Sequence, residues 1–403
     1  MQYRVLLPCL FGLEALVKDE CLEAEFHPEQ IYTEDGEISL VFNSLEEAAA
    51  ASARMNFRSR CAERVLLELV SFEAKTFDEL FDACSATPWE DYVDQGMAIH
   101  IKGYSRKSQL FGISACQSII KKAITERLIK AWKPGSEQLS EDREMGIFQL
   151  QFSIVEDRVG IALDTTGDGL HKRSYRPLKV AAPIRESLAA AILQLSFYER
   201  HLENNENLVD LCCGSGTFAI EAAMIQAGIA PGLKRHFSGE KHRILGQAIY
   251  DREREYARLL RKELSGEARI LAQDIDSRAL EAAKANAKRA GVEKLIKFRK
   301  KDLFKQSPDE LREAAGSDRL LLVANPPYGD RLLTEDEARK ILEGIGKITF
   351  TRGELREGMR LSVITPDKVA EEALGKQADR RRKLYNGNIP CQLFHYFRQK
   401  KQK

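Results

Sequence analysis

Short apolar runs alternate with amphipathic stretches through the first 164 residues of the chain. The apolar runs predict strands, and the stretches with a 3.6-residue period predict helices. The predicted strands cover residues 3–9, 31–42 with a turn at Asp35-Gly36, 65–70, 98–103, 147–156 and 158–164. The predicted helices cover residues 11–24, 44–55, 77–84 and 115–132, and Ser44 with Glu47 and Ser114 with Gln117 match the capping-box spacing. This half therefore predicts a compact α+β unit.

The second half follows another pattern, in which short continuous apolar runs are separated by helical segments. The runs cover residues 208–211, 270–275, 296–299, 320–324 and 361–365. Such runs are typical of parallel strands buried on both faces, so they predict an α/β, Rossmann-like domain. Asp276 and Gly291 bracket the predicted helix 277–290 as its N-cap and its terminating glycine. Residues 165–183 join the two halves.

Length and composition limit the class of protein. The 403 residues, 43% of them hydrophobic, are enough for two to three domains with cores of their own. No window approaches the ~18 consecutive apolar residues of a membrane span, and the first 20 residues do not resemble a signal peptide, so we expect a cytoplasmic protein. The eight cysteines form no C-x-x-C pair and the histidines lack metal-ligand spacing, so we expect no metal.

The charge of the chain is balanced overall but not locally. The net charge is +1, yet residues 1–95 hold 20 acidic and only 7 basic residues. The basic excess lies in residues 100–133, 171–185, 232–262 and 376–403. A solvated helix face is an alternative explanation for any single stretch, whereas several such stretches indicate a polyanionic partner.

The first motif with chemical content is the strand, glycine-rich loop and helix of residues 208–217. Glycines let a ligand approach the backbone, and Asp210 at the strand end can reach a charged or hydroxylated group. Gly214, Gly216 and Ala219 also fit the dinucleotide-binding fingerprint. That alternative requires an acidic residue about 20 positions later. The next strand that ends in an acidic residue ends at Asp274, 58 residues after Gly216, which disfavours the dinucleotide interpretation.

Two carboxylates follow the next strands along the chain. Asp274, at the end of the second strand, is placed to bind the two ribose hydroxyls of a nucleoside cofactor. Asp302, after the third strand, either accepts a hydrogen bond from an adenine amino group or is a plain loop carboxylate. The order of these residues favours a nucleoside-containing cofactor.

The tetrapeptide Asn325-Pro326-Pro327-Tyr328 follows the strand 320–324. Its prolines fix the backbone, so the loop presents acceptors rigidly at the carboxyl edge of the sheet. An exocyclic or amide nitrogen is a poor nucleophile because its lone pair is conjugated. The Asn325 side-chain oxygen and the Pro326 carbonyl can accept hydrogen bonds from both N–H groups of such a nitrogen, while Tyr328 stacks on the planar group that carries it. Alignment then supplies most of the acceleration without a general base, although a purely structural turn is the alternative.

Residues 208–217, 274–276 and 325–328 resemble the class I amino methyltransferases that use S-adenosylmethionine. The resemblance extends over nearly the whole chain to the THUMP-domain RNA methyltransferases similar to the bacterial 23S ribosomal RNA guanine-N2 enzyme. The stretches that carry it are residues 9–14, 111–119, 169–176, 182–186, 229–232 and 325–332. It implies a ferredoxin-like segment at 1–56, an RNA-binding THUMP domain at 57–164 and a catalytic domain at 165–403.

The resemblance also implies the roles of individual residues. The cofactor is expected to be S-adenosylmethionine, lined by Asp210, Cys212, Gly214, Gly216, Thr217, Asp274 and Asp302, with Pro183, Arg185 and Glu186 at its methionine end. Asn325, Pro326, Pro327 and Tyr328 are expected to hold the target guanine. The residues expected to contact 23S ribosomal RNA, free or in an assembling particle, are Lys102, Arg106, Lys107, Lys121, Lys122, Lys172, Arg173 and Arg176.

Several other functions share part of this chemistry. A DNA adenine-N6 or a protein glutamine-N5 methyltransferase would use the same tetrapeptide, and an RNA-binding protein with a silent catalytic domain would keep the same fold. Pro8-Cys9 and Pro390-Cys391 resemble the nucleophile of cytosine-C5 methyltransferases, but neither follows the fourth strand. Cys212-Cys213 could form a redox switch, although small apolar packing explains the pair more simply.

Overall fold

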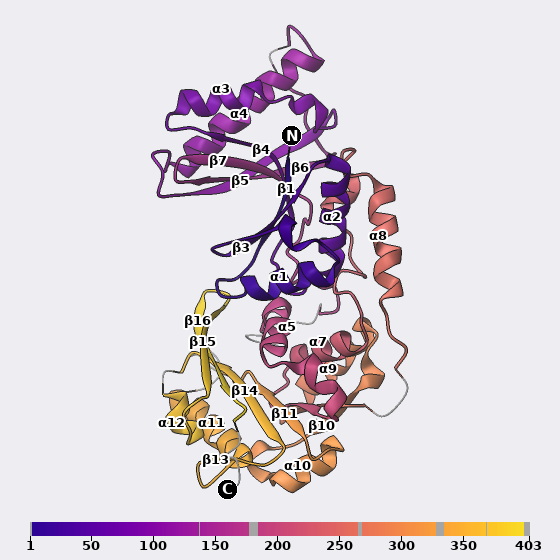
Figure 1. Ribbon diagram of the computed structural model, residues 1–403, viewed down its shortest axis with the longest axis vertical. Helices are drawn as coiled ribbons and strands as arrows, with labels where there is room; N and C mark the ends of the chain where they lie inside the picture. The colour runs from indigo at the N-terminus through magenta and orange to yellow at the C-terminus, as the bar shows by residue number, and fades with distance from the viewer. Residues whose placement is uncertain are drawn as a thin grey trace. The chain divides into compact units, whose positions relative to one another are not determined.

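The computed structural model describes residues 2–136, 138–176, 184–264, 268–327, 334–367 and 369–398 (Figure 1). The chain forms two compact units, each containing a seven-stranded sheet. The first unit comprises Met1–Cys9, Val17–Leu170 and Arg235–Leu259, and the second comprises Leu10–Leu16, His171–Lys234 and Leu260–Lys403. None of the helices in these described ranges is long and apolar enough to cross a membrane.

The first part of the N-terminal unit contains three antiparallel strands and two helices. Its elements are β1 (Tyr3–Pro8), α1 (Glu14–Glu23), β2 (Ile31–Glu34), β3 (Glu37–Phe42) and α2 (Leu45–Arg58). The hairpin predicted at Asp35-Gly36 is confirmed, with Gly36 at a φ of 75° that favours glycine. The predicted cap of α2 is also present, because the Ser44 side chain accepts a hydrogen bond from the N–H of Glu47.

The second part of this unit continues the same sheet. Its elements are β4 (Leu66–Glu73), α3 (Phe77–Ala86), β5 (Met97–Arg106), α4 (Ile113–Trp132), β6 (Asp142–Val155) and β7 (Arg158–Asp164). The strand order is β2-β3-β1-β4-β7-β6-β5, so the antiparallel pairing of β1 with β4 joins the two parts. Strands β5 and β6 run parallel because the long helix α4 crosses between them.

The start of α4 differs from the sequence prediction. The helix begins at Ile113 after Gly112, which provides no side-chain cap. Ser114 and Gln117 therefore lie inside the helix, and the predicted capping box is wrong. A capping residue needs an extended backbone outside the first turn, which Ser114 does not have. The Gln117 amide instead donates a 2.7 Å hydrogen bond to the carbonyl oxygen of Ile101 in β5.

A segment from the second half of the sequence, Arg235–Leu259, belongs to the N-terminal unit. Its helix α8 (Gln247–Leu259) lies beside α2 (Figure 1). The Arg54 guanidinium forms a 3.0 Å ion pair with Glu253, and the buried Tyr250 hydroxyl lies 3.3 Å from the amide nitrogen of Asn56. These contacts join residues 194 and 199 positions apart, so the second half of the chain supplies part of the first unit's core.

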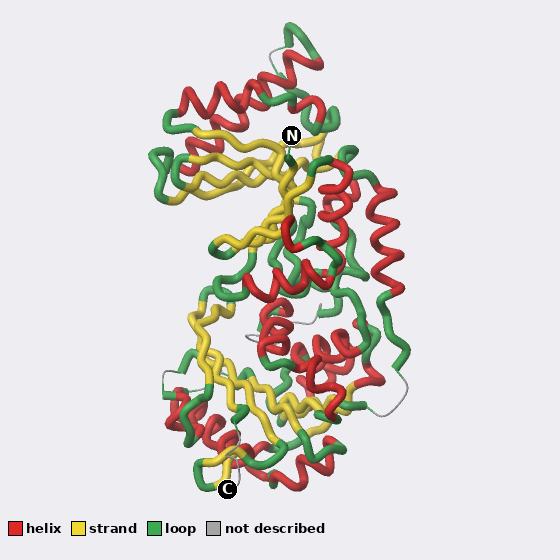
Figure 2. Tube along the Cα trace, in the orientation of Figure 1, coloured by secondary structure: helices red, strands yellow, loops and turns green. Residues whose placement is uncertain are grey.

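The second unit contains a mostly parallel sheet, which runs diagonally in Figure 2. Its strands are β8 (Asn207–Asp210), β9 (Ile270–Asp274), β10 (Ile296–Lys300), β11 (Leu320–Ala324), β14 (Met359–Thr365), β15 (Arg380–Asn386) and β16 (Ile389–Tyr396). Their order is β10-β9-β8-β11-β14-β16-β15. The first five are parallel and correspond to the five predicted apolar runs, whereas β16 is antiparallel to both of its neighbours.

Helices of the second unit precede, connect and follow the parallel strands of this sheet. They are α5 (Glu186–Leu195), α6 (Tyr198–His201), α7 (Thr217–Gln226), α9 (Ser277–Ala290), α10 (Pro308–Ala315), α11 (Glu335–Thr349) and α12 (Ala370–Leu374). A short two-stranded ribbon, β12 (Phe350–Thr351) and β13 (Glu354–Leu355), follows α11. Both predicted ends of α9 are confirmed, because Asp276 accepts from the N–H of Arg278 and Gly291 adopts a φ of 82° at the C-terminus.

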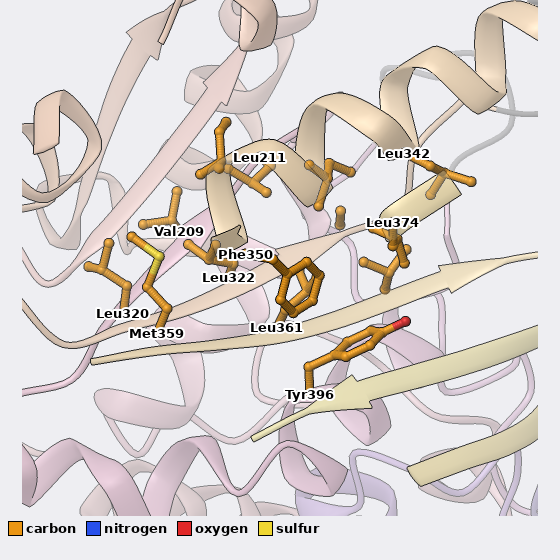
Figure 3. Close-up of a cluster of buried hydrophobic side chains, with 14 of the residues drawn as sticks. Val209, Leu211, Leu320, Leu322, Leu342, Phe350, Met359, Leu361, Leu374 and Tyr396 are labelled. Carbon is orange, nitrogen blue, oxygen red and sulfur yellow. The ribbon is translucent and has the colours of Figure 1, made fainter. Parts of the chain in front are cut away.

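A hydrophobic core packs one face of this sheet against α10, α11 and α12 (Figure 3). Val209, Leu322 and Leu361 from three adjacent strands are each at most 1% exposed. The rings of Phe350 and Tyr396 meet edge to face with centroids 5.1 Å apart. Because every residue of β11 is buried, packing fixes the position of the strand end that precedes Asn325.

Candidate active site at the carboxyl edge of the parallel sheet

The glycine-rich loop lies between β8 and α7, as the sequence predicts. Gly214 and Gly216 have φ values of 51° and 84°, which residues other than glycine rarely adopt. A Cβ on Gly216 would lie 3.0 Å from the Cβ of Ala283 in α9, so close packing also requires this glycine. A Cβ on Gly214 would meet no atom within 4 Å, which leaves open space above the loop where a ligand can approach.

Two polar side chains from outside the loop hold its backbone. The Asp274 carboxylate accepts a 2.8 Å hydrogen bond from the N–H of Gly214 and a 3.0 Å bond from the N–H of Asp276. The Asn286 amide of α9 donates a 3.1 Å bond to the carbonyl oxygen of Ser215. The loop conformation is therefore set by β9 and α9 before any ligand is present.

Strand register places three of the predicted residues at one edge of the sheet. Asp210 pairs with Ala272 of β9 and with Val323 of β11. Asp274 lies two residues beyond Ala272, and Asn325 lies two residues beyond Val323. Side chains two residues apart along a strand point to the same face. Asp210 and Asp274 thus share one sheet face at the carboxyl edge, and Asn325 follows the last residue of the adjacent strand β11 at the same edge.

Asp210 is the most perturbed of these groups. Its side chain is 1% exposed, and neither carboxylate oxygen has a hydrogen-bond partner of normal geometry within the described chain. Burial, helped by the nearby charge of Asp274, raises the pKa of Asp210 to about 8, against the smaller opposing effect of the Cys212 and Ala219 backbone. A buried carboxyl without a cation beside it in the described chain is suited to bind a cationic group of a ligand.

The Asn325-Pro326-Pro327 turn follows β11 directly. Pro326 is buried, and the Asn325 side-chain oxygen is buried without a hydrogen-bond partner in the described part of the chain. An unsatisfied buried acceptor costs about 1–3 kcal/mol unless a ligand supplies the donor. The turn therefore holds an acceptor to which no donor is assigned among the described residues. Tyr328, predicted to stack on the target, lies outside the described residues.

The start of α5 carries the residues predicted for the methionine end of the cofactor. Glu186 is buried and opens the helix, with Arg185 at its N-cap, while Pro183 lies outside the described residues. Burial raises the pKa of Glu186, although the guanidinium of Arg176 lies only 3.2 Å away. The same guanidinium donates a 3.2 Å hydrogen bond to Thr217 Oγ1, at the first turn of α7. Arg176 thus connects the two helix starts that flank the glycine-rich loop.

This placement corrects two of the predicted RNA contacts. Arg173 is fully buried in an ion pair with Glu221, whose other oxygen accepts a 2.8 Å hydrogen bond from Tyr175. Arg176 is 14% exposed and is engaged with Glu186 and Thr217. Neither guanidinium is available to a phosphate on the surface, because acidic partners hold both of them in the interior. Lys172 is exposed, in agreement with a surface contact.

The remaining cofactor candidates have local roles as well. Asp302 caps a 3-10 turn by accepting a 3.0 Å hydrogen bond from the N–H of Phe304, so the alternative of a loop carboxylate has a structural basis. Burial raises the pKa of the Cys212 thiol and of the Cys213 thiol, and the aspartates nearby add to this effect. Both thiols therefore stay protonated, which argues against a nucleophilic or readily oxidised pair.

The predicted RNA contacts in the N-terminal unit lie on β5 and α4. Lys107, Lys121 and Lys122 face Glu156, Glu141 and Glu126 at 3.3–3.8 Å. Lys102 and Arg106 occupy exposed alternate positions of β5 and form no ion pair within the described ranges. Exposed ion pairs contribute only about 0–1 kcal/mol, so a phosphate can replace the acidic partner.

Two exposed aromatic residues on this surface were missed by the sequence analysis. Tyr104 stands between Lys102 and Arg106 on β5 and is 53% exposed. Phe111, just before α4, is 82% exposed. The period-two alternation of β5 would have identified Tyr104, since it shares the face of the two basic residues. Nothing local marks Phe111 as exposed. No group of three or more His, Cys, Asp or Glu residues suited to a metal ion occurs among the residues placed by the structure.

The sheet order with an antiparallel β16 between β14 and β15, and the polar groups at its carboxyl edge, define a class I methyltransferase, a class that uses S-adenosylmethionine. The description "RMKL-like, methyltransferase domain" matches residues 173–395, so the chain belongs to this family. The RlmL ferredoxin-like domain matches residues 4–66, and the THUMP domain matches residues 74–164. The predicted combination of domains is confirmed.

Two curated relatives illustrate the similarity. "Putative RNA methyltransferase YpsC" of Bacillus subtilis is 33% identical over 98% of this chain and 96% of its own length. "Ribosomal RNA large subunit methyltransferase K/L" of Syntrophotalea carbinolica is 32% identical over 88% of this chain and 48% of its own length. The chain therefore spans nearly all of the first relative and about half of the second.

Solved structures agree with this relationship. A possible methylase from Clostridium difficile has a TM-score of 0.85 and 34% identity over the full length of both chains. A predicted N6-adenine-specific DNA methylase from Listeria monocytogenes has a TM-score of 0.84 and 33% identity, covering 98% of this chain and 96% of its own. SMU.472, solved in complex with SAH, has a TM-score of 0.83 and 31% identity over 100% and 99%.

The residues present fit S-adenosylmethionine. The cofactor carries an ammonium group, and Asp210 is a buried carboxyl that forms no ion pair within the described ranges. It carries a ribose with two hydroxyls, and Asp274 ends β9 at the same edge. It must also approach a backbone closely, and the space above Gly214 is open. All three features belong to the chain itself, so they support the assignment independently of the comparisons.

Proposed function

We propose that the protein methylates the exocyclic N2 of a guanine in large-subunit (23S) ribosomal RNA. The observation that carries this proposal is the buried side-chain oxygen of Asn325, which has no hydrogen-bond partner among the described residues and lies at the same carboxyl edge as Asp210 and Asp274. It combines an acceptor for an N–H group with a site for a cationic nucleoside cofactor. The names of the K/L relatives support ribosomal RNA as the substrate.

The target nitrogen is activated by hydrogen bonding alone. The N2 lone pair of guanine is delocalised into the ring, so the amino group is a poor nucleophile. When Asn325 Oδ1 and the Pro326 carbonyl accept hydrogen bonds from the two N–H groups of N2, the nitrogen becomes more pyramidal and its lone pair is less delocalised into the ring. Tyr328 would stack on the base. Positioning of this kind contributes up to roughly 7–11 kcal/mol, so no general base is required before transfer.

The cofactor would be held by the residues of β8, β9 and their loops. Bound S-adenosylmethionine supplies an electrophilic methyl group on its sulfonium. Asp274 would accept from the ribose hydroxyls, Asp210 would face the ammonium group, and Gly214 and Gly216 would allow the close approach of the backbone. Cys212, Thr217 and Asp302 would complete the lining. Arg176 has a positioning role, since it connects Glu186 to Thr217.

RNA recognition would fall to the N-terminal module. We assign docking to residues 57–164, with Lys102, Arg106, Lys107, Lys121 and Lys122 near phosphates and Tyr104 available for stacking. The target base would leave its stack to reach the Asn325 turn. We also place the protein in the cytoplasm, where ribosomal RNA is modified.

The test is a comparison of substrates for one enzyme. The protein is incubated with labelled S-adenosylmethionine and, in separate reactions, with transcribed large-subunit ribosomal RNA, duplex DNA and a peptide-chain release factor. Label is expected in the RNA. Label confined to DNA would support the adenine-N6 activity for which the Listeria protein is named, and label confined to the release factor would support glutamine methylation. RNA binding without label in any substrate would indicate a silent catalytic domain.

A further inference from the structure

The last two strands of the chain form a hairpin that extends past the rest of the sheet. In the register of β14 with β16, Thr365 at the end of β14 pairs with Gln392. Residues 389–391 of β16 and their partners 384–386 of β15 therefore lie beyond the end of β14. At about 3.3 Å per residue, the hairpin projects roughly 10 Å further (Figure 1).

The hairpin projects from the edge that carries the candidate active site. Strand β14 is parallel to β11, and Val363 pairs with Ala324, the residue before Asn325. The carboxyl ends of β11 and β14 thus lie at the same edge. Since β16 runs antiparallel to β14, the turn between β15 and β16 extends on this same side.

The hairpin is anchored at its base. Leu384 and Cys391 face each other across the two strands and are 1% and 5% exposed. Arg381 forms a 2.6 Å ion pair with Glu371 of α12, and Arg382 donates to the carbonyl oxygen of Gly12 in the segment Leu10–Leu16. These contacts fix the backbone, so the tip is a preorganised projection.

Two side chains on one face of this projection are free for a ligand. Lys383 and Tyr385 occupy alternate positions of β15 and therefore point to the same side. Tyr385 is 48% exposed, Lys383 is exposed, and neither forms an ion pair within the described part of the chain. Ile389, next to the turn, is also 44% exposed. Proteins that bind single-stranded nucleic acid combine exposed aromatic rings, on which bases stack, with basic side chains that contact phosphates.

We propose that the β15–β16 hairpin binds the single-stranded RNA that flanks the target nucleotide, with an unpaired base stacked on Tyr385 and a phosphate paired with Lys383. This inference rests on the proposed RNA methyltransferase function and adds a second RNA contact, on the catalytic unit itself. Residues 376–403 contain nine basic residues and one acidic residue, so the electrostatics favour an anionic partner, and the exposed ring of Tyr385 favours one that carries stackable bases.

The test compares three substitutions in the full-length protein. Tyr385→Ala removes the ring, Tyr385→Phe keeps it without the hydroxyl, and Lys383→Glu reverses the charge. Lys288→Glu is the matched control, because Lys288 is exposed near the C-terminal end of α9, which lies toward the opposite edge of the sheet. Binding to transcribed ribosomal RNA is measured by filter retention at several salt concentrations, and KM and kcat for methyl transfer are measured in parallel.

Tyr385→Ala is expected to raise both the RNA dissociation constant and KM by about 5- to 100-fold, the range for loss of one base stack. Tyr385→Phe is expected to stay within about twofold. Lys383→Glu should lower the slope of log binding constant against log salt by about 0.7, one phosphate contact on a single strand. The dissociation constant for S-adenosylmethionine and kcat at saturating RNA should be unchanged, as should every parameter of Lys288→Glu.

Wild-type binding and KM in both Tyr385→Ala and Lys383→Glu would overturn the hairpin proposal. So would binding to anionic phospholipid vesicles that the same variants abolish while RNA binding is retained. A wild-type enzyme that binds RNA through the hairpin but methylates only DNA would contradict the proposed function and leave the hairpin contact supported. The two proposals therefore fail under different results.

Discussion

The backbone N–H of Gly214 donates a 2.8 Å hydrogen bond to the Asp274 carboxylate, 60 residues further along the chain. The bond joins the glycine-rich loop after β8 to the end of β9. It also leaves the carboxylate at the carboxyl edge, on the same sheet face as Asp210 and at the edge where Asn325 follows β11. One side chain thus fixes the loop and remains available to accept hydroxyl hydrogen bonds from a bound nucleoside.

Replacing Asp274 is expected to weaken cofactor binding selectively. Asp274→Ala removes the acceptor for Gly214 and for the ribose hydroxyls, so the dissociation constant for S-adenosylmethionine should rise about 10- to 100-fold. Asp276→Ala is the control, because it removes a neighbouring carboxylate that only caps α9. Calorimetric titration of both variants measures the effect. Equal losses in the two would show that Asp274 acts through the local backbone alone.

Cofactor binding is expected to release a proton from Asp210. The pKa of this carboxyl is raised to about 8, so at pH 7 it is mostly protonated in the cofactor-free protein. A bound ammonium group favours the ionised form, so the affinity for S-adenosylmethionine should increase with pH between about 6 and 7.5. In that range the amino group of the cofactor remains mostly protonated.

Calorimetry in two buffers of different ionisation enthalpy measures this proton. The wild type should release close to one proton at pH 7, and Asp210→Asn should release none. A binding enthalpy that does not depend on the buffer in the wild type would show that Asp210 does not face the ammonium group.

Stability is expected to fall in mild acid because of two buried histidines. Burial lowers the pKa of His242 and of His395 to about 4, from an ordinary value near 6.5. Between these values the unfolded chain binds protons that the folded chain does not, so the free energy of unfolding decreases as the pH falls from about 6.5 to 4. The loss is up to about 3 kcal/mol for each histidine.

Denaturant unfolding at pH 7 and pH 4.5 measures this loss. His242→Phe should reduce the difference between the two pH values, whatever its effect on stability at pH 7. His236→Phe is the control, because the His236 side chain is 88% exposed. If His242→Phe and the wild type lose the same stability in acid, the buried imidazole is not responsible.

Asn325 is expected to act in transfer and not in cofactor binding. Asn325→Ala removes the buried acceptor, so transfer should fall by at least 100-fold, the loss typical of one preorganised hydrogen-bonding group. The dissociation constant for S-adenosylmethionine should stay within about threefold of the wild type. Single-turnover transfer and equilibrium titration separate the two effects. Loss of cofactor affinity would contradict the role assigned to this side chain.

The parallel sheet and its site could be predicted because local patterns determine them. Continuous apolar runs identify strands buried on both faces, and Asp210, Asp274 and Asn325 follow such runs directly. The caps of α2 and α9 depend on residues within one turn of the helix start, so they were predicted as well. These features need no knowledge of distant partners.

Most of the errors concern residues whose partners lie in another element of the chain. Arg173 and Arg176 belong to a basic run, but Glu221 and Glu186 hold them in the interior. The β15–β16 hairpin was not predicted, because the run Arg380–Lys383 interrupts the apolar pattern of an edge strand. Helix α8 was not assigned to the first unit, since its contacts with α2 join residues almost 200 positions apart.

Identification of the methylated nucleoside tests the central claim most directly. Transcribed large-subunit ribosomal RNA is incubated with S-adenosylmethionine and either the wild type or Asn325→Ala, then digested to nucleosides and analysed by mass spectrometry. We predict N2-methylguanosine with the wild type and none with the variant. N6-methyladenosine as the product, or equal N2-methylguanosine from both proteins, would contradict the account.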